Sequence, residues 1–293
     1  MENTNNTNNT IEKAPDRLKV IENIKKRIEE GNLNGKVEEG DPIVTQEQRE
    51  EVIFKYDLLK KKLIHKLRRA KARFIVNQYM KKTENDVEII GLENIKDIKG
   101  GAVVTSNHFH YYDATITKRI ANKTGRKNKF KIIVEEENVF LPGFYGFLFN
   151  NYDMLPLSSS KEYMTSKLFP AIKELLKKGN FILIYPEEQM WFNYRKPRPL
   201  KTGAYHIAVK NNVPIIPCFT EIRDKDEYDE NGFKKSKYIL HVMKPLYPDE
   251  TKLLKERKQD LAKRDYELKV KAYEESYGKK LDYKFEDADI AGF

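Results

Sequence analysis

The chain is poor in cysteine and in long apolar runs, and both absences limit what it can be. Its 293 residues include one cysteine, Cys218, so no intramolecular disulfide framework can form. The longest apolar stretches, such as residues 181–184, have the length of a strand and are too short to span a bilayer. The N-terminus also lacks the basic start and apolar middle of a secretory signal, so we expect a cytoplasmic protein.

Charged residues are abundant and their balance is basic. Lys and Arg number 55 against 45 Asp and Glu, which gives a formal net charge of +10 at pH 7. Such a balance favours a polyanionic partner, which can be nucleic acid, an anionic membrane face or an acidic carrier protein. The charge alone does not choose among them.

Composition divides the chain into four regions. Residues 1–44 are predicted to be a polar, largely flexible arm with a short helical pattern near residues 20–30. Residues 45–84 have the pattern of a long basic amphipathic helix that starts at a capping box formed by Thr45 and Gln48. Residues 85–248 are the predicted α/β domain, and residues 249–293 are a charged helix followed by a polar tail.

The basic helix has one apolar stripe, made of Ile53, Leu59, Leu63, Leu67, Phe74 and Ile75. Its other faces carry Lys60, Lys61, Lys62, Lys66, Arg68, Arg69, Lys71 and Arg73. This pattern is typical of a helix that lies on an anionic membrane surface. A helix that packs on the domain and exposes a solvated basic face would look the same, and the two readings are compatible.

Short β-rich runs alternate with helical patterns in the predicted domain. The expected strands are residues 87–90, 102–105, 131–134, 181–185 and 214–219, and the expected helices are residues 115–123, 163–178 and 201–210. The alternation predicts an α/β fold with a mostly parallel, mixed sheet flanked by helices. A turn at residues 229–232 leads to a further strand at 238–243, which we expect at an antiparallel edge.

The segment TSNHFHYYDAT, residues 105–115, follows one of these strands and allows three readings. His108 and Asp113 could simply cap backbone groups. His108, His110 and Asp113 could hold a metal in a hydrolase, but only His206 and His241 remain downstream and neither has a partner at ligand spacing. In the third reading His108 is a general base that Asp113 orients, because a histidine can accept a proton at neutral pH, and the substrate supplies the hydroxyl.

Four blocks across roughly residues 86–245 resemble the PlsC-like glycerolipid acyltransferases. They are Asn107–Asp113, residues 141–157, Ile184–Glu187, and Lys201–Ala204 with residues 213–217. The resemblance implies that His108 is the general base, that Asp113 assists it, and that Gly146 and Glu187 bind substrate. It also implies an acyl-CoA or acyl-carrier-protein donor, a lysophospholipid or related lipid acceptor, and no metal or other cofactor.

The blocks depart from the family pattern where phosphate-binding arginines are expected. Ser158–Lys161 stands in place of the arginine of the second block, and Glu188, Gln189 and Met190 replace the usual Gly-Thr-Arg of the third. The downstream segment 191–201 could compensate, with Arg195, Arg198 and Lys201 holding a phosphate, or it could be a solvated basic loop. Glu187 and Glu188 would also suit a cationic or sugar-like acceptor.

The aromatic cluster at residues 140–149 is expected either to line an acyl pocket, to face the membrane or to pack in the core. Taken together, the patterns predict an O-acyltransferase that attaches peripherally to the anionic inner face of a membrane and binds no nucleic acid. Two alternatives from other classes remain open. One is a metal-dependent hydrolase that uses His108, His110 and Asp113, and the other is a nonenzymatic protein that binds anionic membranes.

Overall fold

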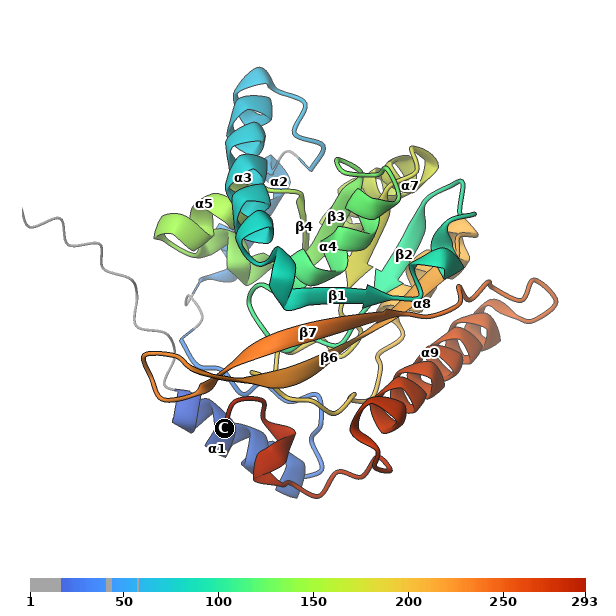
Figure 1. The fold of residues 1–293 in the computed structure, drawn as a ribbon. Helices are drawn as coiled ribbons and strands as arrows, with labels where there is room; N and C mark the ends of the chain where they lie inside the picture. Colours follow the sequence, from blue (N-terminus) through green and yellow to red (C-terminus); the bar gives the residue numbers. More distant parts are fainter. Residues whose placement is uncertain (1–16, 41–43, 57) are drawn as a thin grey trace, which may run out of the picture.

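A mixed sheet forms the centre of the molecule (Figure 1). The computed structural model describes residues 17–40, 44–56 and 58–293. Within these residues seven strands lie in the order β1-β7-β6-β2-β5-β3-β4. They are β1 (Val87–Ile90), β2 (Ala102–Thr105), β3 (Phe130–Glu135), β4 (Met154–Leu157), β5 (Phe181–Ile184), β6 (Ile215–Tyr228) and β7 (Lys234–Val242). Only β6 and β7 pair antiparallel, so the predicted class is confirmed.

Helices cover both faces of this sheet (Figure 1). The α-helices are α1 (Arg17–Glu29), α2 (Gln46–Lys55), α3 (Leu63–Lys82), α4 (Asp113–Lys123), α5 (Gly143–Asn151), α6 (Lys161–Tyr163), α7 (Phe169–Lys177), α8 (Gly203–Asn211) and α9 (Leu254–Tyr277). The short 3-10 helices are η1 (Glu84–Asp86), η2 (Leu92–Ile95), η3 (Glu136–Phe140) and η5 (Asp287–Asp289). The segment η4 (Met164–Leu168) is a π-helix. In the part of the chain that the structure describes, we find no helix with the length and apolar character needed to cross a membrane.

The pleat of β2 divides the core into two layers. All four residues of β2 are buried. Val103 packs in one cluster with residues of α7, α8 and α9, whereas Ala102 and Val104 pack in the other cluster with residues of α3 and α4. Successive side chains of a strand point to opposite faces, so β2 is covered on both sides and lies in the middle of the fold.

Three strands differ from the sequence-based expectation, and β6, expected at residues 214–219, extends to Tyr228. The antiparallel strand expected at residues 238–243 is the longer β7, and it is not an edge, because β1 pairs in parallel with its outer side from Val87 opposite Tyr238. β4, which the strand pattern did not predict, pairs with β3 and forms the opposite edge of the sheet.

The basic region predicted as one helix over residues 45–84 consists of two helices, α2 and α3. The capping box at the start of α2 is confirmed, because the Gln48 backbone N–H donates to Thr45 Oγ1 at 3.3 Å and the Thr45 N–H donates to Gln48 Oε1 at 3.1 Å. Ile53 of α2 packs in the cluster that contains Val103, whereas Ala72, Val76 and Met80 of α3 pack on the opposite face of the sheet. One straight helix could not reach both faces, so the chain breaks between them.

The N-terminal arm packs on the domain over the residues that the structure describes. Val20, Ile21 and Ile24 of α1 are buried in a cluster with Trp191, Phe192, Tyr194 and Ile290. The expectation of a largely flexible arm is therefore wrong for residues 17–40, because three apolar side chains on one face of α1 find an aromatic surface to cover. Residues 1–16 of the predicted arm lie outside the described residues. The C-terminus lies beside α1 (Figure 1).

Candidate active site

The histidine motif lies between the carboxyl end of β2 and the start of α4. Asn107 fixes this loop to β6, because its Nδ2 donates to the Thr220 carbonyl oxygen at 3.0 Å and its Oδ1 accepts from the Thr220 N–H at 2.8 Å. Asp113 is the first residue of α4. The carboxyl ends of parallel strands are where α/β folds build their sites, so the motif occupies the expected edge of the sheet.

His108 and Asp113 form a hydrogen-bonded pair. His108 Nδ1 lies 2.7 Å from Asp113 Oδ2, and the side chains are 22% and 3% exposed. The same carboxylate oxygen accepts from the backbone N–H groups of Phe109 at 3.0 Å and His110 at 3.3 Å. With Nδ1 held as a donor, Nε2 is left as the ring nitrogen that can accept a proton.

Tyr185 completes the support of Asp113, and the sequence analysis did not identify it. Its hydroxyl donates to Asp113 Oδ1, so both carboxylate oxygens are occupied. Burial, together with the charge of Asp113, raises the pKa of Tyr185 well above its ordinary value, and the hydroxyl stays protonated as a donor. The one available signal was its place directly before Pro186 and Glu187.

The electrostatics keep Asp113 ionised. Burial alone would raise the pKa of its carboxyl, but the charge of His108 and hydrogen bonds from His108, Tyr185 and Phe109 lower it below its ordinary value. An ionised carboxylate stabilises the imidazolium that forms when His108 takes up a proton. The pair therefore has the arrangement of a general base with its orienting carboxylate.

A buried polar network lies beneath this loop. Asp265 and Lys269 of α9 pair with each other with fully buried side chains. Asp265 Oδ2 accepts from Thr105 Oγ1 and from the Tyr205 hydroxyl, each at 2.6 Å, and Lys269 Nζ donates to Thr105 Oγ1 at 3.0 Å. Because Thr105 ends β2, α9 helps to hold the strand from which the histidine loop emerges.

A cavity of about 590 Å³ opens beside His108 and Asp113. Its apolar wall comes from β3, β4, α5 and α7 and includes Ile132, Val134, Met154, Tyr145, Phe149 and Phe169. Its polar lining includes Lys36, Glu38, Glu188, Lys201 and Lys258. Tyr145 and Phe149 belong to the aromatic cluster for which an acyl pocket was one expectation.

Lys201 is the predicted phosphate ligand that the structure brings to this cavity. Its backbone N–H donates to the Pro186 carbonyl oxygen at 2.7 Å, which places it beside the third block. Gly146 is buried inside α5, where a Cβ atom would lie 1.7 Å from the Leu141 carbonyl oxygen. That close approach explains the glycine by backbone packing, without a contact to substrate.

Glu187 and Arg198 face each other in the interior instead of the cavity. Arg198 Nη2 donates to Glu187 Oε2 at 3.0 Å, and the side chains are 1% and 2% exposed. Glu187 also accepts from the backbone N–H of His108 at 3.2 Å and from that of Arg198 at 3.0 Å. The pair braces the loop that contains His108, and neither side chain lines the cavity, where the sequence analysis expected an acceptor-binding role.

Arg195 is likewise engaged away from the cavity. Its guanidinium donates to Asp224 Oδ1 at 2.6 Å and to the carbonyl oxygens of Ala288 at 2.7 Å and Ile222 at 3.2 Å. These contacts join the loop after β5 to β6 and to the C-terminal segment. The predicted phosphate-binding pair of arginines is therefore not assembled in this structure.

The second histidine of the motif has a different environment. Burial, only partly opposed by the charge of Asp113, lowers the pKa of His110 to about 4. Its Nδ1 accepts from the Tyr112 backbone N–H at 3.3 Å. Across residues 17–40, 44–56 and 58–293, no three or more His, Cys, Asp or Glu side chains are grouped in a way that could hold a metal ion. This geometry does not support the hypothesis of a metal-dependent hydrolase that uses His108, His110 and Asp113 as ligands.

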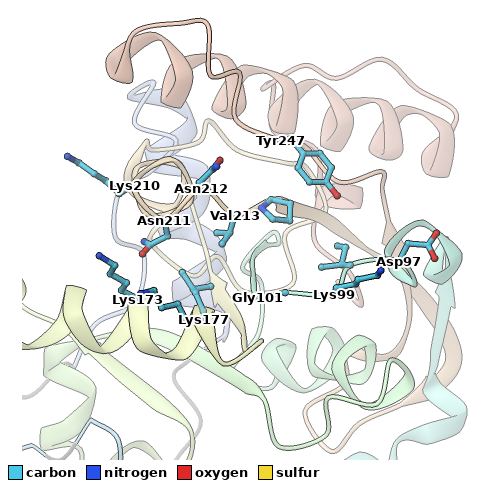
Figure 2. A pocket seen from close by; sticks show the side chains of 14 residues that line it. Asp97, Lys99, Gly101, Lys173, Lys177, Lys210, Asn211, Asn212, Val213 and Tyr247 are labelled. Atoms are coloured by element: carbon cyan, nitrogen blue, oxygen red, sulfur yellow. The ribbon is translucent and has the colours of Figure 1, made fainter.

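A second cavity, of about 620 Å³, lies at the amino ends of the central strands β2 and β6 (Figure 2). Gly101 and Pro214, at the amino ends of β2 and β6, line it together with four lysines, Lys99, Lys173, Lys177 and Lys210. None of its 14 lining residues is a histidine or a cysteine, and Asp97 is its one carboxylate. The cavity beside His108 is therefore the candidate active site.

Residues 86–221 match the family model described as Acyltransferase. This segment contains the His108–Asp113 pair, Tyr185 and Glu187, together with six of the seven strands wholly or in part. The segment therefore matches an acyltransferase domain, and the resemblance seen in the four sequence blocks is confirmed.

The chain is also similar to individual acyltransferases. It is 27% identical over 130 residues to a chloroplastic 1-acyl-sn-glycerol-3-phosphate acyltransferase, BAT2, of Brassica napus. That match covers 44% of this chain and 36% of the relative, so this chain spans about a third of its length. A crystal structure of the 1-acyl-sn-glycerophosphate acyltransferase PlsC from Thermotoga maritima aligns with 18% identity and a TM-score of 0.42, over 87% of this chain and 95% of that one.

Proposed function

We propose that this protein is an O-acyltransferase that moves a fatty acyl group from a thioester donor to a hydroxyl of a lysophospholipid or related glycerolipid. The observation that carries the proposal is the His108–Asp113 pair at a large, partly apolar cavity inside the acyltransferase domain. A general base needs a reachable nitrogen and an orienting partner, and this pair supplies both.

The proposed reaction starts when His108 Nε2 takes the proton of the acceptor hydroxyl. The acceptor oxygen then attacks the thioester carbonyl carbon and forms the new C–O bond. When the C–S bond breaks, the imidazolium returns its proton to the departing sulfur, so the products are an ester and a free thiol. Asp113 keeps Nδ1 protonated throughout and stabilises the imidazolium.

The apolar wall of the cavity suits a long acyl chain, which we propose is the group that is transferred. Side chains such as Ile132, Met154 and Phe169 would bury the methylene groups of the chain, each worth roughly 0.8 kcal/mol. The donor is an acyl-CoA or an acyl-carrier protein, and the chemistry at the thioester is the same for both. No metal or additional cofactor takes part in the proposed steps.

We further propose that α3 attaches the protein to the anionic inner face of a membrane. Leu63, Leu67 and Phe74 lie on one face of α3 and are 73%, 61% and 63% exposed. Lys61, Lys66, Arg68 and Lys71 surround this stripe and are also exposed. The Lys71 ammonium lies 5.6 Å from the centre of the Phe147 ring of α5, the helix that contributes Tyr145 and Phe149 to the cavity.

Mass spectrometry of acyl transfer tests the function. Purified protein is incubated with acyl-CoA or acyl-carrier-protein donors and a panel of lysolipids, and new diacyl products are measured. His108→Ala should lower turnover by about 10²–10⁴-fold at unchanged folding, and Asp113→Asn nearly as much. His65→Ala, which changes a histidine of α3 outside the cavity, is the control.

Three outcomes would count against the proposal. Wild-type turnover from folded His108→Ala protein would show that His108 is not the general base. Loss of activity on adding a metal chelator would instead favour the hydrolase reading of His108, His110 and Asp113. Intact membrane binding with no product from any donor would favour the nonenzymatic alternative.

A further inference from the structure

The N-terminal segment 33–38 lies against the loop that follows β5, although it is outside the matched acyltransferase segment. Asn34 Nδ2 donates to the carbonyl oxygens of Glu187 at 3.1 Å and Pro199 at 2.8 Å. Trp191 Nε1 donates to the Gly35 carbonyl oxygen at 2.8 Å, and Arg198 Nη1 donates to that of Leu33 at 3.2 Å. Four hydrogen bonds therefore hold this short segment in one place.

The same loop residues also hold the general base. Glu187 Oε2 accepts from the His108 backbone N–H at 3.2 Å, and the Trp191 backbone N–H donates to the His108 carbonyl oxygen at 3.1 Å. Glu187 and Trp191 thus bind the N-terminal segment and the histidine loop at once. Single residues, Glu187 and Trp191, therefore connect the segment to His108.

Side chains of the segment reach the cavity itself. Lys36 and Glu38 line it together with His108. Glu38 Oε2 accepts from the hydroxyl of Tyr111, which belongs to the histidine loop and also lines the cavity, at 2.9 Å. A part of the chain that the family model does not cover therefore supplies a wall of the candidate active site.

Lys36 lines the cavity, as Lys201 and Lys258 do, and it is the cation that the segment 33–38 contributes. Arg195 and Arg198 are bound elsewhere, as described above. Lys258 lines the cavity near His206 of α8. Burial and the charges of Lys210 and Lys258 lower the pKa of His206. Lys258 thus belongs to the side formed by α8 and α9, whereas Lys36 is attached through its neighbours to the loop around His108.

We propose that residues 33–38 are an acceptor-binding element and that Lys36 contacts an anionic group, a phosphate, in the polar head of the acceptor. This inference rests on the proposed function, since it assigns the acceptor's head group to the site of His108. It gives residues 33–38 of the N-terminal arm a role in acceptor specificity beside that of the cavity residues of the acyltransferase domain.

The single tryptophan of the chain offers a direct measurement that needs no turnover. Trp191 is fully buried, donates to Gly35 and lies 4.6 Å from the Arg198 guanidinium, so its fluorescence should report ligand binding at the segment. The protein is titrated, without acyl donor, with a short-chain lysophosphatidic acid, with the monoacylglycerol of the same chain length, and with inorganic phosphate. Variants are Lys36→Ala, Lys36→Arg and, as a control, Lys26→Ala on the exposed side of α1.

We expect Lys36→Ala to raise the apparent Kd for lysophosphatidic acid by about 10–100-fold, because a charge-assisted hydrogen bond is lost. Binding of the monoacylglycerol should not change, Lys36→Arg should retain most of the affinity, and Lys26→Ala should behave as wild type. Thermal unfolding of each variant shows that the fold is kept.

Three results would overturn the inference. They are equal lysophosphatidic acid affinity in Lys36→Ala and wild type, the same loss of affinity for the monoacylglycerol, and a response to inorganic phosphate as strong as that to the lysolipid. Acyl transfer is measured in parallel. Binding that depends on Lys36 with no transfer would sink the proposed reaction and leave the binding site standing, so the two failures are distinguishable.

Discussion

The ring of Tyr185 stacks on the imidazole of His108, with ring centres 3.9 Å apart and planes 11° apart. Its hydroxyl at the same time donates to Asp113 Oδ1. One side chain therefore limits the rotation of both members of the pair, the base through its face and the carboxylate through a hydrogen bond.

Tyr185→Phe should lower kcat by about two- to tenfold and change the KM of the acceptor little. The stacking ring stays, and the loss corresponds to one hydrogen bond with a net value of about 0.5–1.5 kcal/mol. Steady-state kinetics measure it. Tyr163→Phe is the matched control, because it removes a buried tyrosine hydroxyl that donates to the Pro156 carbonyl oxygen and does not line the cavity. Equal effects of the two variants on kcat would deny Tyr185 a specific role.

Arg198→Ala should lower the free energy of unfolding of the protein, and its effect should not be confined to acceptor binding. The substitution leaves the Glu187 carboxylate buried without its partner, and breaking such a pair costs about 3–5 kcal/mol. Urea unfolding measures the change, with Arg68→Ala on the exposed face of α3 as control. Wild-type stability combined with a raised acceptor KM would restore the phosphate-binding role expected from the sequence.

The strands and the His108–Asp113 pair could be predicted because their signals are local. Residues 87–90 and 102–105 are short apolar, β-rich runs, and both strands have the predicted bounds. His108 and Asp113 are five positions apart at the end of a strand, so the chain itself brings them together.

The partners of the charged residues could not be predicted, because they depend on the tertiary structure. Arg198 is close in sequence to aromatic and basic residues, which suggested an open phosphate site. In the fold it meets Glu187 and the backbone of Leu33, 165 positions away. The Asp265–Thr105 hydrogen bond joins residues 160 positions apart. Spacing in the sequence contains no signal for such contacts.

Stability should depend on pH through His110. Its pKa is about 4 in the folded protein, because of burial, against an ordinary value near ~6.5 in an unfolded chain. Between these values the unfolded chain binds a proton that the folded chain does not, so stability falls as the pH falls through this window. Below about pH 4 both states are protonated and the loss is complete.

A comparison with His110→Gln isolates this effect. Glutamine has no titrating group, so wild type should lose about 1–2 kcal/mol more than the variant between pH 7.5 and pH 5, with allowance for partial exposure of the ring. Urea unfolding at the two pH values measures the difference. The same loss in both proteins would mean that His110 is not the titrating group.

Membrane attachment through α3 should require both its lysines and its apolar stripe. Anionic lipid attracts each nearby Lys or Arg by about 1 kcal/mol, and salt screens this attraction, so binding to anionic vesicles should weaken steeply with ionic strength. Leu67→Ser and Phe74→Ser should each lower binding about tenfold, since each removes an apolar side chain that the headgroup region would bury. Vesicle sedimentation measures both effects.

Leu253→Ser is the matched control for this experiment. Leu253 is 72% exposed but stands at the start of α9, outside α3, so its loss should not alter vesicle binding. If it weakens binding as much as Leu67→Ser does, the effect belongs to general surface hydrophobicity and α3 is not the attachment site. Equal sedimentation of the wild type with neutral and anionic vesicles would remove the electrostatic part of the proposal. Loss of binding in the α3 variants, with acyl transfer to a soluble short-chain acceptor preserved, would separate attachment to the membrane from the chemistry at His108.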